Sequence, residues 1–468
     1  MRSNIYKPLL LVALVIIILT LLHFIPTIKI AGTELRKIDI LSDLTIKENN
    51  ANTAIITSQN DVIKLKTSKG DIISFKEEWG KGIEPIIDYG INTNNSLDTF
   101  YDAISKLSAH KKLGRAVRIA YFGDSYIEGD ILLADLRELL QRKYGGCGVG
   151  WLDAGNDINE YKHTTTHKYS GLVEHMVKKP ASYDVSKAAI SERYYTLTAQ
   201  GQISLSPFVM HEYKHTDHWS STKLYLRPMA GATVDITIDG KRHQRMVLPP
   251  SSNVQQVELK GNTSNALIKV DGKKAILFGT AQEGLEGIVV DNFSMRGSDG
   301  VSLAKLPEEM LKRFAAIRPY DLIVFQFGVN AVDANTTEER LKMYTGKMRD
   351  VISLFKRSFP KTSILIMGVP DRGSKASNNG TMKGIVELEL LQKKLSKESK
   401  VGFYSLFNAI GGAGSMLRLV DEKDMGSKDY IHINYKGGGF LANRIFKSIV
   451  AGQKNYVRRK ELMEGKGK

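Results

Sequence analysis

Three short segments of the chain carry side chains that together could perform nucleophilic acyl transfer. Residues 123–125 read Gly-Asp-Ser and follow a largely apolar run. Residues 328–330 read Gly-Val-Asn after a second apolar run, and residues 429–432 read Asp-Tyr-Ile-His. A serine nucleophile needs an adjacent base, the base needs an orienting partner, and the developing oxyanion needs N–H donors. These residue types predict an acyl-transfer site assembled from distant parts of the sequence.

The first segment places its serine between two predicted elements. Ser125 follows a predicted strand at residues 117–122 and precedes an amphipathic helix predicted at residues 127–144. A serine in this position projects from the carboxyl edge of a sheet. Its backbone N–H is expected at a helix N-terminus, where negative charge is favoured.

The other two segments supply the base and a polar amide. His432 is the only histidine after His243, so it is the candidate base in the carboxyl-terminal half. Asp429, three residues earlier, can fix the imidazole tautomer and stabilise the imidazolium that forms. Asn330 can point its amide N–H at the developing oxyanion, an interaction worth roughly 3–4 kcal/mol in comparable sites.

At these segments the chain resembles the SGNH, or GDSL, hydrolase family. Residues 123–125 match the nucleophile block, residues 328–330 the block with the oxyanion asparagine, and residues 429–432 the D-x-x-H block. Residues 291–297, which end in Gly297, fit the block that carries an oxyanion glycine. The sequence departs from the family pattern where Ala replaces the usual Asp after the asparagine.

The resemblance implies a role for each matched residue. Ser125 would be the nucleophile, His432 the base and Asp429 the orienting acid. The N–H groups of Ser125 and Gly297 and the side chain of Asn330 would form the oxyanion hole. This chemistry calls for no cofactor and no metal ion.

The chain around these motifs alternates strands with helices, which favours a parallel sheet covered by helices on both faces. The predicted strands are residues 117–122, 288–293, 321–327, 363–369 and 401–406. The predicted helices are residues 96–114, 127–144, 303–317, 336–359 and 382–399. Ligands bind such sheets at the carboxyl ends of the strands, where Ser125, Gly297 and Asn330 all fall. We therefore predict a flavodoxin-like three-layer α/β/α SGNH hydrolase fold.

Residues 151–286 interrupt this alternation with short runs of alternating polarity and turn pairs such as Asp-Gly. They predict a β-sandwich inserted into the hydrolase domain, similar in arrangement to peptidoglycan O-acetylesterases of the family that carry a carbohydrate-binding-module-like insert. Within it, His211, His215 and His218 are interpreted as part of a polar loop rather than a metal site. Trp219 is a candidate substrate-binding residue that could stack on a sugar.

Composition excludes some classes of function. The 468 residues include one cysteine, Cys147, in a Gly-Gly-Cys-Gly stretch, which excludes a disulfide framework and suggests small-residue packing. The net charge of +16 suggests an anionic neighbour. Basic residues are spread along the chain and no nucleic-acid-binding motif occurs, so nucleic acid is not expected as a partner.

The amino-terminal segment predicts the compartment. A nearly unbroken apolar run covers residues 9–24, after two basic residues and before Pro26, and no A-x-A-like cleavage site follows it. We expect an uncleaved single-pass helix in the inner (cytoplasmic) membrane, with the catalytic domain facing the periplasm or the cell exterior. The predicted organisation is an anchor at 1–27, a membrane-proximal spacer at 28–94, the hydrolase domain at 95–150 and 287–452, the β-insert at 151–286 and a basic tail at 453–468.

These features favour a serine esterase that removes O-acetyl groups from an extracytoplasmic glycan through an acyl-serine intermediate. Peptidoglycan is the most favoured glycan. One alternative is an O-acetyltransferase acting on a cell-envelope polysaccharide, because the same acyl-serine can pass to a sugar hydroxyl. A lipase or thioesterase is a further alternative, less favoured because no long apolar lid is apparent. A scaffold without turnover is disfavoured by the intact set of candidate catalytic residues. The expected partners are the acetylated glycan and the membrane, and the sequence leaves the oligomeric state open.

Overall fold

The computed structural model describes residues 29–30, 33–34, 62–66 and 72–464. The chain divides into two units, Met1–Asn60 and Asp61–Lys468. In the first unit the described residues form an antiparallel pair of short strands, β1 (Lys29–Ile30) and β2 (Thr33–Glu34). The predicted anchor at 1–27 lies outside the described residues. Among the residues that are described, no helix combines the length and the apolar character needed to cross a membrane.

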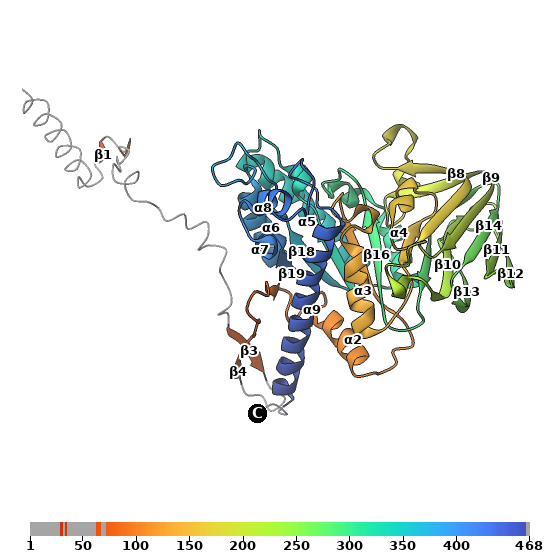
Figure 1. Ribbon diagram of the computed structural model, residues 1–468, viewed down its shortest axis with the longest axis horizontal. Helices are drawn as coiled ribbons and strands as arrows, with labels where there is room; N and C mark the ends of the chain where they lie inside the picture. Colours follow the sequence, from red (N-terminus) through yellow and green to blue (C-terminus); the bar gives the residue numbers. More distant parts are fainter. Residues whose placement is uncertain (1–28, 31–32, 35–61, 67–71, 465–468) are drawn as a thin grey trace, which may run out of the picture. The chain divides into compact units, whose positions relative to one another are not determined.

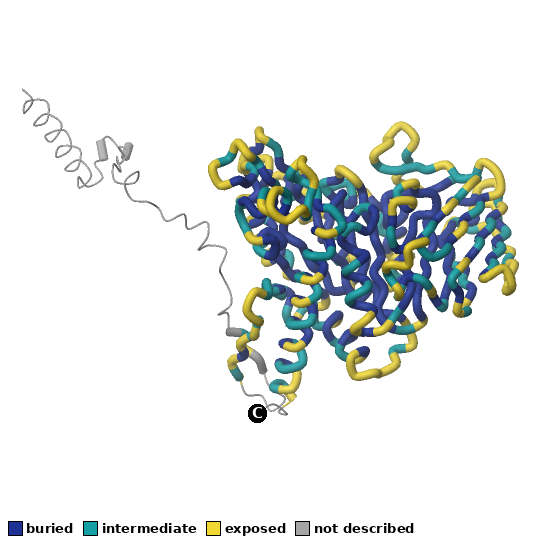
Figure 2. Tube along the Cα trace, in the orientation of Figure 1, coloured by how far each residue is buried: buried dark blue, intermediate teal, exposed yellow. Residues whose placement is uncertain are grey.

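The second unit is built on a six-stranded sheet with the order β16-β6-β17-β18-β19-β5. The first five strands run parallel, and β5 pairs antiparallel with β19 at one edge. The strands are β5 (Ile86–Asp88), β6 (Val117–Gly123), β16 (Ile288–Ser294), β17 (Leu322–Gln326), β18 (Ser363–Gly368) and β19 (Gly402–Ser405). Every residue of the five parallel strands is buried, as expected where helices cover both faces (Figure 2). The predicted α/β fold is confirmed.

The helices of this unit form two groups. In one, α2, α3 and α9 pack against one another, with α3 and α9 side by side across the strands (Figure 1). In the other, α5 packs against both α4 and α6. The helices are α2 (Asp98–Ser108), α3 (Leu133–Tyr144), α4 (Glu308–Ile317), α5 (Glu338–Ser358), α6 (Ile385–Ser399), α7 (Leu406–Ile410), α8 (Ser415–Asp421) and α9 (Tyr435–Met463). Two such groups are expected where helices cover both faces of a parallel sheet.

The helices predicted at residues 127–144 and 96–114 are both shorter in the structure. The helix behind the candidate nucleophile begins at Leu133 rather than residue 127, because the chain first makes a short 3₁₀ turn, η1 (Glu128–Asp130). Gly129 and Asp130 have φ of 61° and 64° there, a left-handed conformation that interrupts an α-helix. The expectation that the Ser125 N–H lies at the N-terminus of this α-helix is therefore wrong. The helix predicted to end at residue 114 ends at Ser108.

The predicted β-insert forms a nine-stranded, antiparallel sheet around its own apolar core. Hydrogen bonds link all nine strands into one sheet, rather than the two separate sheets of the predicted sandwich. The strands are β7 (Gly150–Asp153), β8 (Thr166–Met176), β9 (Arg193–Ser206), β10 (Trp219–Pro228), β11 (Ala232–Ile238), β12 (Arg242–Leu248), β13 (Gln255–Thr263), β14 (Ala266–Asp271) and β15 (Ala275–Glu283). The long strand β9 pairs with β14 near its end and with β15 near its start, so it carries the sheet from one half of the domain to the other.

The chain leaves and re-enters the hydrolase domain through two adjacent glycine-rich segments. A Cβ atom on Gly148 would lie 2.2 Å from the Gln282 carbonyl oxygen, and one on Gly287 would lie 2.2 Å from the Gly146 nitrogen. Only glycine permits such close contact of two backbones. The Cys147 thiol is buried between these glycines, which agrees with its predicted packing role.

Buried charges join the β domain to the six-stranded sheet at this crossing. Arg318 donates to both carboxylate oxygens of Asp291 on β16, at 2.7 and 2.8 Å, and lies 2.9 Å from the carboxylate of Glu283 at the end of β15. Arg118 on β6 donates to both oxygens of the same Glu283 carboxylate, at 3.0 and 2.6 Å. Burial by itself raises the pKa of Glu283, but the attraction of Arg318 and Arg118 outweighs it and lowers that pKa well below its usual range. Glu283 is therefore ionised, and the side chain of Lys223 pairs with it as well.

We predict that Arg318→Ala lowers the free energy of unfolding by about 3–5 kcal/mol, because it leaves two buried carboxylates without their main partner. Arg340→Ala is the matched control, since Arg340 pairs with Asp333 on the surface and should leave stability nearly unchanged. Denaturant unfolding of both variants measures the difference. Equal losses would show that the Arg318 network contributes no more than a surface ion pair.

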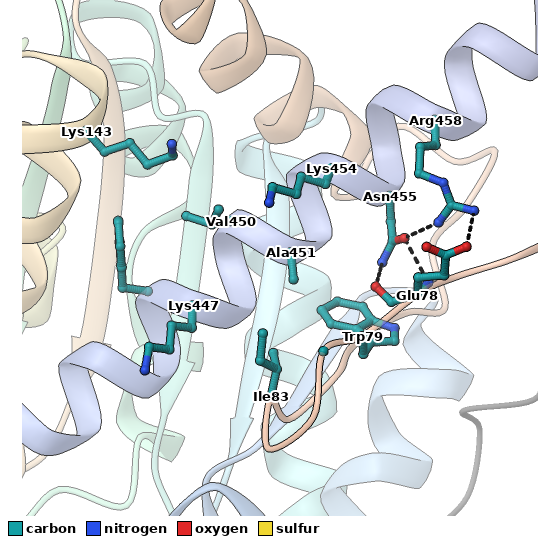
Figure 3. A pocket seen from close by; sticks show the side chains of 12 residues that line it. Glu78, Trp79, Ile83, Lys143, Lys447, Val450, Ala451, Lys454, Asn455 and Arg458 are labelled. Carbon is teal, nitrogen blue, oxygen red and sulfur yellow. Dashed lines mark hydrogen bonds and ion pairs between the residues drawn. The ribbon is translucent and has the colours of Figure 1, made fainter. Parts of the chain in front are cut away.

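Two predicted boundaries at the ends of the hydrolase domain are wrong. The predicted basic tail at 453–468 is helical as far as Met463, where α9 ends. Asn455 exchanges two hydrogen bonds with the backbone of Glu78, and Arg458 pairs with the Glu78 carboxylate at 2.8 Å (Figure 3). The predicted spacer at 28–94 likewise contributes β5 to the main sheet. These residues belong to the hydrolase domain because they are paired with it.

Candidate active site

Ser125 lies two residues after the end of β6, at the carboxyl edge of the six-stranded sheet. Its side chain is mostly buried, with 7% of the residue exposed. The Ser125 Oγ atom lies 2.8 Å from His432 Nε2, a hydrogen bond that joins residues 307 positions apart in the sequence. The structure thus brings the first and third predicted segments together.

His432 is in turn held by Asp429. The His432 Nδ1 atom lies 2.6 Å from Asp429 Oδ2. The other carboxylate oxygen of Asp429 accepts hydrogen bonds from the backbone N–H groups of Ile431 and His432, at 2.9 and 3.0 Å. Tyr430 adopts a left-handed φ of 57° to close this turn. A local turn therefore fixes the carboxylate against the imidazole ring.

This arrangement defines the proton positions on the imidazole ring. Partial burial raises the pKa of Asp429, but the hydrogen bonds from the side chain and backbone of His432 and from Ile431 outweigh it and lower that pKa below its usual value. An ionised carboxylate accepts only, so His432 Nδ1 carries a hydrogen and donates it to Asp429. In its neutral form such a ring presents the Nε2 lone pair to the hydroxyl of Ser125. This is the geometry that general-base activation of a serine requires.

Asn330 lies at the end of β17, in the 3₁₀ turn η7 (Val329–Ala331). Its side-chain amide donates to Asp124 Oδ2 at 3.2 Å and to the Ser298 carbonyl oxygen at 3.0 Å. The first of these bonds connects Asn330 to the residue that precedes Ser125. The second connects it to the residue that follows Gly297. All four predicted segments thus meet at one edge of the sheet.

Gly297 follows β16 and is exposed, with a left-handed φ of 67°. Its carbonyl oxygen accepts a hydrogen bond of 2.7 Å from the side chain of Lys178, which belongs to the β domain. Two residues earlier, the Met295 N–H donates to the Gly123 carbonyl oxygen at 2.9 Å and ties this loop to the end of β6. The β domain therefore contacts the rim of the candidate site.

Asp124 has a structural part in the site that the sequence motif did not reveal. It is 2% exposed and accepts from the Tyr126 N–H at 3.0 Å as well as from Asn330. Burial raises the pKa of Asp124 to about 7, although these hydrogen bonds and the attraction of His432 act in the opposite direction. The carboxyl thus gains or loses its proton near neutral pH while it positions the Asn330 amide.

We predict that Asp124 makes the protein less stable as pH rises from about 4 to about 7. The folded state holds the Asp124 proton up to about pH 7, whereas the unfolded chain releases it near the ordinary pKa of 3.8. The protonated Asp124 therefore contributes to stability at low pH, and this contribution is lost as the pH rises from about 4 to about 7. The free energy of unfolding of Asp124→Asn, relative to that of the wild-type protein, should rise by on the order of a few kcal/mol between about pH 4 and about pH 7. Above about pH 7 this difference should stay constant. Denaturant unfolding at several pH values measures this rise, and a difference that is the same at low and neutral pH would contradict it.

The structure does not support Trp219 as a sugar platform. Trp219 is only 2% exposed, packs in the core of the β domain, and donates its indole N–H to Thr222 Oγ1 at 2.8 Å. Its position at the start of β10 explains the burial. The prediction failed because an aromatic residue beside a polar loop can equally face the core.

The neighbouring histidines do not converge on one point. His211 lies 2.9 Å from the carboxylate of Asp217 within the same loop. His215 lies 2.7 Å from the carboxylate of Glu138, which belongs to α3 of the hydrolase domain. The contact of His215 anchors the loop against α3, whereas that of His211 lies within the loop.

A cavity of about 580 Å³ lies away from the candidate catalytic residues, along α9. Figure 3 shows Trp79 and Ile83 on one side of it and lysines 447 and 454 of α9 on the other. None of the predicted site residues lines it.

No protein-family model matches the chain, and no curated protein matches it. Among solved structures, one described as a peptidoglycan O-acetylesterase in action matches with a TM-score of 0.65 and 19% sequence identity, over 79% of this chain and 99% of that one. A family two carbohydrate esterase from Cellvibrio japonicus gives a TM-score of 0.25 at 8% identity, over 63% of this chain and 99% of that one. An acetyl xylan esterase gives a TM-score of 0.25 at 17% identity, over 34% and 79%.

The likeness to the peptidoglycan O-acetylesterase covers nearly all of that structure, so it includes both the α/β sheet and the β domain. The resemblance in fold that the motifs predicted is thereby confirmed. The chain shares with that structure a fold in which a β-rich domain is added to an α/β domain.

Proposed function

We propose that this protein is a serine esterase that removes O-acetyl groups from an extracytoplasmic glycan, with peptidoglycan as the first candidate substrate. The observation that carries the proposal is the continuous hydrogen-bond chain from Ser125 through His432 to Asp429. The fold supports it, because the structure it resembles is that of a peptidoglycan O-acetylesterase.

The reaction follows from this geometry in two steps. In the first, Ser125 Oγ attacks the acetyl carbonyl carbon while its proton passes to His432 Nε2, and Asp429 stabilises the imidazolium. The C–O bond to the sugar breaks, the sugar oxygen takes the proton from His432, and an acetyl-serine remains. In the second, a water molecule gives its proton to His432 and attacks the acetyl-serine. Acetate leaves and Ser125 regains its proton.

The negative charge on the attacked oxygen needs donors at the carboxyl edge of the sheet. We propose the N–H groups of Ser125 and Gly297 and the side-chain amide of Asn330. Both amide hydrogens of Asn330 already have acceptors, in Asp124 and the Ser298 carbonyl. Donation to the oxyanion therefore requires Asn330 to exchange one of them. The Ser298 carbonyl is the better candidate for exchange, because the bond to Asp124 keeps the amide next to Ser125.

We predict that Ser125→Ala and His432→Ala each reduce acetate release from O-acetylated peptidoglycan by about 10⁴–10⁶-fold, since members of such a triad act as a unit. His243→Ala is the control, because His243 lies on β12 and is half exposed beside Asp235. Acetate is measured enzymatically, and circular dichroism checks folding. A folded Ser125→Ala protein with near-normal turnover would disprove the proposed nucleophile.

We predict that Asn330→Ala lowers kcat by roughly 10²–10³-fold with little change in KM, because its bond to the substrate oxygen strengthens in the transition state. Steady-state kinetics on p-nitrophenyl acetate separate the two constants. A loss confined to KM would instead assign Asn330 to ground-state substrate binding.

The same acyl-serine could pass its acetyl group to a sugar hydroxyl instead of water. Assaying acetate release with and without a non-acetylated glycan acceptor tests this, since a transferase would form acetylated acceptor at the expense of acetate. We also propose that the protein acts outside the cytoplasm, held by the apolar segment within 1–27. Protease accessibility in intact and permeabilised cells tests that location.

A further inference from the structure

A second cavity, of about 640 Å³, lies between the hydrolase domain and the β domain. We call it the Tyr161 groove, after its most exposed aromatic residue. Its floor includes Gly129 and Ile131 of the segment that follows Ser125. The side chains that matter for what it could bind are Glu128, Tyr161, His163, Phe208, Arg296 and Tyr435.

The Tyr161 groove is connected to the candidate active site through the chain itself. Glu128 comes three residues after Ser125, Arg296 directly precedes Gly297, and Tyr435 comes three residues after His432. The short turns that carry the catalytic groups thus continue into one wall of the groove. A polymer whose acetylated unit is bound at Ser125 can therefore extend into the groove along these segments.

Aromatic rings form much of the lining. His163 stacks on Tyr435 with ring centroids 4.1 Å apart and on Phe208 with centroids 5.0 Å apart, nearly parallel in both cases. The Tyr435 hydroxyl lies within hydrogen-bond distance of the carbonyl oxygens of Gly129 and Tyr161, at 3.0 and 2.7 Å. These contacts hold His163, Phe208 and Tyr435 in place on the wall of the groove where the two domains meet. Tyr161 itself remains 67% exposed, so its ring offers apolar surface to a ligand.

The remaining lining combines two isoleucines, Ile131 and Ile158, with side chains that carry both signs of charge. Arg296 pairs with the Glu128 carboxylate at 3.1 Å, and the Arg296 side chain is 72% exposed while that of Glu128 is 12% exposed. Beside them His163 lies 3.3 Å from the carboxylate of Glu212. The groove therefore offers hydrogen-bond donors and acceptors next to an aromatic face. A sugar ring matches this combination, because it presents hydroxyl and amide groups at its edge and C–H groups on its face.

We infer that the Tyr161 groove binds a sugar unit of the glycan strand next to the acetylated one. This inference rests on the proposed function, because it names the part of the substrate that this face of the active site recognises. The aromatic residue that contacts sugar is then Tyr161, which is exposed, and not Trp219 as the sequence predicted. Binding energy from such a remote unit favours polymer over small acetyl esters.

A binding measurement without turnover tests the groove independently of catalysis. Full-length Ser125→Ala protein is co-sedimented with insoluble O-acetylated peptidoglycan, and with the same material after mild alkali has removed its esters. We expect Tyr161→Ala in this background to weaken binding to both about tenfold, because the contact is with the sugar ring and not the acetyl group. Tyr161→Phe, which keeps the ring, should bind within about twofold of its parent.

Val247→Ala is the matched control, since Val247 is 78% exposed on β12, outside the groove. Arg296→Gln is a second groove variant that changes an exposed side chain and should also weaken binding several-fold. Unchanged binding in both Tyr161→Ala and Arg296→Gln would overturn the inference, as would an equal loss in Val247→Ala.

Kinetics on the active protein separate this inference from the proposed function. Tyr161→Ala should lower the ratio of kcat/KM on O-acetylated peptidoglycan to kcat/KM on p-nitrophenyl acetate about tenfold. An unchanged ratio would overturn the groove as a sugar site while the esterase stands. Groove-dependent binding by a protein that releases no acetate from peptidoglycan would instead overturn the esterase and keep the sugar site.

Discussion

The buried ion network around Arg318 is the constraint on which the arrangement of the two domains depends. Arg318, Glu283 and Asp291 are almost completely removed from water, so each is tolerable only while the others stay in place. Glu283 closes the last strand of the β domain, and Asp291 lies within the first sheet strand that follows it. The ion pairs therefore set the position at which the chain returns to the hydrolase sheet. That return strand leads directly to Gly297 and Arg296, at the rim of the site.

The parallel sheet brings together residues that lie far apart in the sequence. Ser125, Gly297 and Asn330 each follow a strand whose carboxyl end lies at the same edge, so the register of β16, β6 and β17 brings them together. His432 has no such strand before it. Its position comes from the turn closed by Asp429 and from the start of α9, whose N-cap Asn434 accepts from the Gly437 N–H at 3.0 Å. One catalytic element is thus placed by the sheet and the other by a capped helix.

The sequence predicted most reliably those features that depend on local pattern. Apolar runs located all five parallel strands, and the motif residues were found to meet as expected. Three strands of the β domain, β7, β8 and β12, were not predicted from the sequence. The bulge between Ser170 and Leu172 breaks the alternation of β8, and β12 is a largely exposed edge strand with four basic or polar residues at its start. The burial of Trp219 and the length of α9 depend on partners far away in the sequence, which no local pattern records.

The triad and the β domain contribute differently to recognition of the substrate. A serine, a histidine and an aspartate in this geometry can attack any accessible ester, so they do not by themselves choose a glycan. The choice requires a surface beyond the acetyl group, and the chain supplies one where Tyr161 and Phe208 of the β domain face Glu128 and Tyr435 of the hydrolase domain. Because the catalytic turns and one wall of this groove share the same short segments, a strand held by its sugar face is aligned with Ser125 at the same time. If the Tyr161 groove binds sugar as proposed, the β domain inserted between β6 and β16 couples polymer binding to ester cleavage.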